Sequence, residues 1–97
     1  MEISRNEKSV RLVLPSVLGL GESEDLLAAL RNLHGEEAPY AIDGSAVARI
    51  NTPCLQVLLC ALLSREGTAL TAPSLPMLAV IDELGMTEHF EERMVLE

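Results

Sequence analysis

The sequence predicts an α/β fold, with helices around a mixed β-sheet in the order β-α-β-α-β-α. Short aliphatic segments alternate with longer segments in which Leu recurs at helical spacing, and Gly or Pro stands at most of the borders. The composition is also that of a globular chain, with 48% hydrophobic and 23% charged residues. We expect one domain over residues 1–97, because a chain of this length can bury roughly 60–68% of its unfolded surface.

The first strand and the first helix open this series. Residues 10–14 are aliphatic and end at a proline, as is typical of a strand. Residues 22–32 carry Leu at helical spacing behind a cap at Gly21 or Ser23, and Gly35 follows as a stop. These features predict an amphipathic helix with one buried side.

The second strand is predicted at residues 38–43. Because a helix connects it to the first strand, the two strands form a βαβ unit and should pair in parallel. The remaining elements are predicted as a helix at 52–64 stopped by Glu66-Gly67, a strand at 69–72, a helix at 75–84 closed by Gly85, and a short turn or helix within 86–94.

The helix at 52–64 has two apolar sides. At 100° per residue, its core side is predicted to hold Leu55, Leu58, Leu59, Leu62 and Leu63. Its outward side holds Pro53, Gln56, Val57, Cys60 and Ser64. Two interpretations stay open for the outward side: either another helix or the C-terminal segment covers it, or it is an exposed patch that docks a protein.

The turn before this helix is the predicted functional site. Pro53 favours a helix start and an extended residue before it, so Thr52 is expected to be the N-cap. A helix N-terminus carries a partial positive charge and favours anions and phosphorylated side chains. Thr52 is therefore the candidate phosphorylation site.

Residues 43–58 resemble the STAS domain pattern Asp-x-Ser-x-Val-x-x-Ile-Asp-Ser/Thr-Ser/Ala-Gly-Leu-x-x-Leu. The matching residues are Asp43, Ser45, Val47, Ile50, Thr52, Leu55 and Leu58, with Asn51 in place of the second Asp. Residues 75–90 also resemble the closing helix of the family, with its Leu-x-x-x-Gly-Leu-x-x-x-Phe ending. The chain is therefore similar to a stand-alone STAS domain of the bacterial anti-sigma factor antagonist type.

This resemblance implies a protein that binds another protein and takes part in signal transduction. The implied partner is an anti-sigma factor of the histidine-kinase-like ATPase type, or a kinase-related component of a signalling or chemotaxis pathway. Pro53 stands where these antagonists carry their phosphorylated serine, and Cys54 stands where the family has Gly. The alternative is the STAS subunit of an ABC-type lipid transport complex, which keeps only the hydroxyl at the Thr52 position.

Partner contacts are expected from nine residues of this region, namely Asp43, Ser45, Asn51, Thr52, Pro53, Cys54, Gln56, Val57 and Cys60. Structural roles are equally compatible with some of them. Asp43 with Gly44 is a common turn pair, Asn51 can bond to its own backbone, and Thr52 can simply cap.

The sequence contains no motif for catalysis, a metal or a cofactor, so we expect a protein that is not an enzyme. His34 precedes a helix stop and His89 lies among carboxylates, and Cys54 and Cys60 are spaced six residues apart, which does not suit a redox or metal pair.

A net charge of −8 argues against nucleic acid and anionic lipid as partners. Without a leader or an apolar run of about 18 residues, we expect a cytoplasmic protein. A homodimer is compatible with the sequence. Leu96 and Glu97 are compatible with a cloning remnant, and we assign them no structural role.

Overall fold

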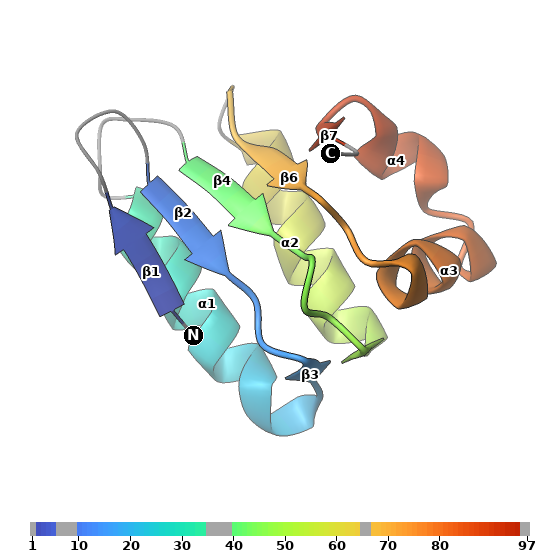
Figure 1. The fold of residues 1–97 in the computed structure, drawn as a ribbon, viewed down its shortest axis with the longest axis horizontal. Helices are drawn as coiled ribbons and strands as arrows, with labels where there is room; N and C mark the ends of the chain where they lie inside the picture. Colours follow the sequence, from blue (N-terminus) through green and yellow to red (C-terminus); the bar gives the residue numbers. More distant parts are fainter. Residues whose placement is uncertain (1, 6–9, 35–39, 65–66, 96–97) are drawn as a thin grey trace.

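A computed structural model describes residues 2–5, 10–34, 40–64 and 67–95, and Figure 1 shows their arrangement. The strands are β1 (Glu2–Arg5), β2 (Val10–Val13), β3 (Val17–Leu18), β4 (Tyr40–Asp43), β5 (Arg49–Ile50), β6 (Ala69–Thr71) and β7 (Met94–Val95). The helices are α1 (Leu20–His34), α2 (Thr52–Ser64), α3 (Leu75–Glu83) and α4 (Thr87–Glu91). The predicted α/β class is confirmed. Gly35, residues 38–39, Glu66 and residues 96–97 lie outside the described residues, as does the side chain of His34.

The main sheet has the strand order β1-β2-β4-β6-β7. The predicted parallel pairing of the first two strands is confirmed, since β2 pairs in parallel with β4 and places Leu12 opposite Ile42. Strand β1 is antiparallel to β2, so the sheet is mixed. In the second sheet, the two-residue strands β3 and β5 pair in parallel with each other.

Helices α1 and α2 lie side by side across one face of the main sheet (Figure 1). Alternate strand residues point towards them, and these buried residues are Val10, Leu12, Tyr40, Ile42 and Leu70. Helices α3 and α4 lie beside β6 and β7 at one edge of the sheet (Figure 1), and Phe90 of α4 is fully buried. With few aromatic residues, the core is built mainly from Leu, Ile and Val.

The predicted start of the first helix is wrong. Helix α1 begins at Leu20, so Gly21 and Ser23 lie inside it and cannot be its cap. Gly19 precedes the helix instead, and its N–H donates to Oε2 of Glu22 at 3.1 Å. This contact is the carboxylate half of a capping box, in which the third helical residue reaches back to the cap.

Helix α2 has the predicted bounds, but its buried side differs from the prediction. Leu63 is 58% exposed, whereas Cys54 and Ala61 are buried. The buried residues centre on Leu58 rather than on Leu55, a rotation of about 60° about the helix axis. This rotation carries Leu63 away from the sheet.

The structure also adds the strands β1, β3, β5 and β7 to the six predicted elements, so the predicted order is incomplete. Three of these strands are only two residues long, which is too short to show an alternating pattern in the sequence. Helix α4 lies within residues 86–94, where a short turn or helix was expected.

The revised core of α2 gives a paired stability prediction. Leu58→Ala should lower the free energy of unfolding by about 2–5 kcal/mol, because it opens a cavity at a fully buried position. Leu63→Ala should change it by less than about 0.5 kcal/mol, because that side chain is mostly in solvent. Urea unfolding followed by circular dichroism measures both free energies of unfolding. Equal decreases for the two variants would show that Leu63 is buried and not exposed.

Candidate functional site

Pairing of β3 with β5 brings the starts of α1 and α2 together. The carbonyl oxygen of Ser16 accepts from the N–H groups of Ala48 and Arg49 at 2.7 and 3.0 Å. The N–H of Asn51 donates to the carbonyl oxygen of Leu18 at 2.9 Å. Both helices follow directly after these strands, so their N-termini lie near the same edge of the fold (Figure 1).

The loop between β4 and β5 is held from its other side by Ser74. The N–H of Ser74 donates to the carbonyl oxygen of Gly44 at 3.1 Å, and its hydroxyl donates to the carbonyl oxygen of Val47. The same hydroxyl caps α3 by accepting from the N–H of Met77 at 3.2 Å. A Cβ on Gly44 would lie 2.8 Å from Sδ of Met77, so any larger residue would force the buried side chain of Met77 to shift.

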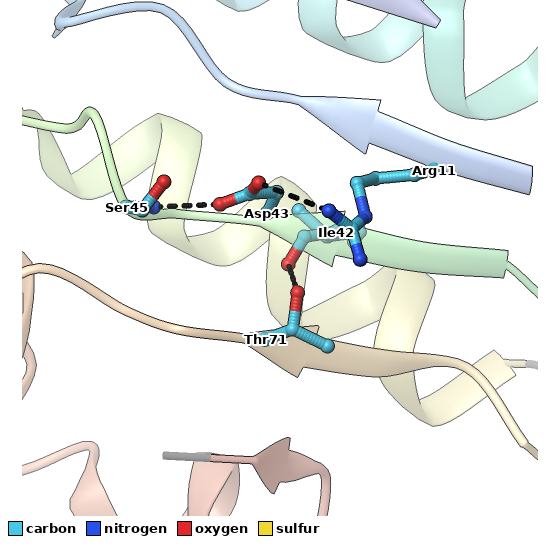
Figure 2. Close-up of polar contacts among 5 residues, drawn as sticks. All are labelled: Arg11, Ile42, Asp43, Ser45 and Thr71. Atoms are coloured by element: carbon cyan, nitrogen blue, oxygen red, sulfur yellow. Dashed lines mark hydrogen bonds and ion pairs between the residues drawn. The ribbon is translucent and has the colours of Figure 1, made fainter. Parts of the chain in front are cut away.

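Asp43 ends β4 and shapes the start of this loop (Figure 2). Its Oδ1 accepts from the N–H of Ser45 at 2.9 Å, and its Oδ2 lies 3.7 Å from Nη1 of Arg11 on the neighbouring strand. On the other side, the hydroxyl of Thr71 donates to the carbonyl oxygen of Ile42 at 3.3 Å. The side chain of Asp43 is only 16% exposed, and its two oxygens contact Ser45 and Arg11. These contacts give Asp43 a structural role in shaping the turn.

The pKa of Asp43 is lower than its ordinary value. Burial is the largest influence and raises this pKa, but the hydrogen bonds from Ser45 and the positive charge of Arg11 lower it by more in sum. The carboxylate is therefore charged at neutral pH, and its charge holds the turn after β4.

The N-cap of α2 is Asn51, so the predicted cap at Thr52 is wrong. Oδ1 of Asn51 accepts from the N–H of Cys54 at 3.0 Å, and its carbonyl oxygen accepts from the N–H of Leu55 at 3.2 Å. Thr52 and Pro53 are then the first two helical residues. Pairing of Asn51 with Leu18 explains the shift, because it keeps Asn51 extended up to the point where the helix begins.

The predicted contact residues divide into two groups. Ser45, Thr52, Pro53, Gln56 and Cys60 are exposed. Asp43, Asn51 and Val57 are partly buried, and Cys54 is fully buried. The structure therefore brings eight of the nine residues to the surface at least in part, along one loop and one side of α2.

Cys54 is a packing residue rather than a contact residue. Its Sγ lies 3.7 Å from the carbonyl oxygen of Gly19, which links the starts of the two helices. Burial, together with the negative charge of Glu22, raises the pKa of the Cys54 thiol. The thiol thus stays protonated at neutral pH, and its burial takes Cys54 out of the predicted set of contact residues.

An apolar groove of about 490 Å³ runs between α1 and α2. Its lining residues are Leu27, Leu30, Arg31, Pro53, Gln56, Val57, Cys60, Ala61 and Ser64. Helix α1 borders this side of α2 without closing over it, and no residue of the described C-terminal segment lines the groove. Helix α1 therefore covers the outward side of α2 in part: Val57 is half-buried, whereas Cys60 is exposed.

Sequence reasoning missed the α1 side of the groove and the role of Ser74. The motif Ser74-Leu75-Pro76 repeats the order of Asn51-Thr52-Pro53, a capping side chain two residues before a proline, and this order could have identified both caps. The positions of Leu27 and Arg31 depend on how α1 packs beside α2, which no local pattern reveals.

Comparison with protein-family models gives no match for this chain, and comparison with curated proteins gives none either. Across the described ranges, no helix is both long and apolar enough to cross a membrane. Within the same ranges, no three His, Cys, Asp or Glu side chains are grouped so that they could hold a metal ion.

The cap assignment predicts different results for two adjacent residues. Asn51→Ala should lower the free energy of unfolding by about 0.5–2 kcal/mol, because an N–H in the first turn of α2 loses its acceptor. Thr52→Val should cost less than about 0.5 kcal/mol, because no capping bond depends on its hydroxyl. Chemical unfolding of both variants tests the assignment, and the reverse ranking would restore Thr52 as the cap.

The lowered pKa of Asp43 predicts a dependence of stability on pH. Its folded pKa lies below the unfolded value, so the carboxylate stabilises the fold at pH values above its ordinary pKa. This contribution is lost as the pH falls through the folded pKa. Asp43→Asn should therefore destabilise the protein at neutral pH, and the difference from the wild type should shrink below about pH 4. Urea unfolding over a pH series measures it, and a constant difference would contradict the assignment.

Proposed function

We propose that this chain is a non-catalytic protein–protein interaction module resembling the anti-sigma factor antagonists of the STAS family. It binds a cytoplasmic regulatory partner, either an anti-sigma factor or a kinase-related signalling or chemotaxis protein. The contact surface is formed by the loop and helix of residues 51–60, without Cys54. One observation carries this proposal: exposed side chains follow one side of α2, which has no charged residue and borders an apolar groove.

The hydrogen bonds that hold the loop before α2 support a role in binding. Asn51, Ser74 and Asp43 each hold part of it by hydrogen bonds, so the exposed side chains of Ser45 and Thr52 start from a fixed backbone. A surface that is ordered before contact loses less conformational entropy when a partner binds. The fold thus favours recognition through this edge.

Thr52 is placed where phosphorylation could control binding. It is exposed at the first position of α2, whose first turn contains no acidic residue, and Arg49 is exposed three residues earlier. A phosphate there adds a charge of about −1.5 to −2, which the helix N-terminus tolerates. The fold would persist while the contact surface changes its charge.

The alternative function is a STAS subunit of an ABC-type lipid transport complex. The observation that favours it is the exposed Thr52 hydroxyl beside Pro53, where no second hydroxyl is present. Such a subunit would bind its ATPase constantly, without a phosphorylation step. The identity of the partner separates the two functions.

Site-specific photo-crosslinking in cells tests the proposal. A photoreactive residue in place of Gln56 should capture an ATPase of the histidine kinase type or a kinase-related protein, identified by mass spectrometry. The same residue in place of Glu83, exposed on α3, is the matched control and should not capture that protein. Capture of a transporter ATPase from Gln56 would support the alternative, and identical capture from both positions would contradict the surface.

The affinity of the identified partner gives a second prediction. Cys60→Asp should raise its Kd about tenfold or more, because a charge enters the uncharged side of α2 at an exposed position. Ala79→Asp introduces the same charge at an exposed position of α3 and should leave the Kd unchanged. Calorimetric titration measures both, with circular dichroism as a check of folding. An equal increase in Kd for both variants would indicate that the added negative charge acts through the net charge of the protein and not at this surface.

A further inference from the structure

The groove between α1 and α2 extends along nearly the whole of α2. Its lining residues on this helix recur at intervals of three or four from Pro53 to Ser64, a distance of about 16 Å. None of them carries a charge, in a chain whose net charge is −8. Identical copies of such a chain repel one another, and this uncharged side of α2 is where they could approach most closely.

One charged residue of α1, Arg31, lines the groove, and the oppositely charged Glu24 lies on the same side of this helix two turns earlier. Glu24 and Arg31 are both exposed and lie seven residues apart, about 10 Å along the helix, with exposed Leu27 and Ala28 between them. On a helix, a charged side chain can pair with a residue three or four positions away. Towards the middle of α1, these positions are Leu27 and Ala28 for both Glu24 and Arg31, and neither residue is charged. No ion pair joins Glu24 or Arg31 to any other residue in the described part of the chain.

We propose that a second copy of this chain covers the groove. The α1–α2 layers of the two copies pack face to face about a two-fold axis perpendicular to the helices. Each helix is then antiparallel to its equivalent, so Glu24 of each copy lies opposite Arg31 of the other, and Leu27 lies opposite Ala28. On α2, the uncharged side that carries Val57 and Cys60 faces the same side of the other copy. Charge complementarity selects the second copy as the occupant, because one surface supplies both members of each ion pair.

The two grooves join in this arrangement to form the interior of a four-helix layer. Apolar side chains from both copies then leave water together, which supplies the main driving force for association. The inference does not depend on the proposed partner. Because Val57 and Cys60 belong to both surfaces, however, a partner that binds through them must separate the two copies.

Sedimentation velocity of the purified full chain, from about 1 µM to about 1 mM, tests the inference. The wild type should change reversibly from monomer to dimer within this range. Arg31→Glu should raise the dimer Kd about tenfold, because it places two carboxylates opposite each other at both ends of the interface. The double variant Glu24→Arg with Arg31→Glu keeps the net charge and should restore the wild-type Kd.

The single variant Glu24→Arg separates this interface from a general charge effect. It reduces the net negative charge, so weaker overall repulsion predicts a tighter dimer, whereas two facing arginines predict a weaker one. A monomer at every concentration would overturn the inference. So would a dimer whose Kd is the same for the wild type, Arg31→Glu and Glu24→Arg, which would indicate pairing through another surface, such as the open edge of β1.

Discussion

The backbone pairing of β3 with β5 is the constraint on which the candidate site depends. Each strand is only two residues long, and each comes directly before a long helix. Because Ser16 and Leu18 accept hydrogen bonds from the segment that leads into α2, the two helix starts have a fixed separation. The Cys54 thiol and the Gly19 carbonyl add a contact between the same two starts. The groove between α1 and α2 follows from this fixed separation.

Polar side chains add hydrogen bonds that hold the same region in place. Asn51 and Ser74 each cap a helix, and Ser74 also binds the loop before α2 through the Val47 carbonyl. A buried or partly buried backbone group without a hydrogen-bond partner costs free energy. These bonds therefore satisfy the backbone groups of the loop and also fix its conformation. The loop between β4 and β5 is therefore set by the start of α3 as well as by its own sequence.

The sequence predicted the parts of the fold that depend on periodic patterns. The bounds of α2 and the parallel pairing of β2 with β4 were correct, because Leu spacing and aliphatic runs are strong local signals. The cap of α2 was misplaced by one residue, because Asn51 and Thr52 are both good capping residues and the choice depends on the bond from Asn51 to Leu18. That bond joins segments far apart in the sequence.

The same limit explains the side of α2 that was assigned wrongly. A helical wheel gives the relative angles of residues but not the direction of the sheet, and an apolar residue lies on every side of this helix. Leu63 was therefore assigned to the core although it is exposed, and the buried position of Ala61 was not predicted. Once Leu58 faces the sheet, Val57 and Cys60 turn towards α1 and solvent, where they form one wall of the groove. The position of the proposed docking surface thus follows from a core residue, because the packing of Leu58 fixes the rotation that exposes the opposite side of α2.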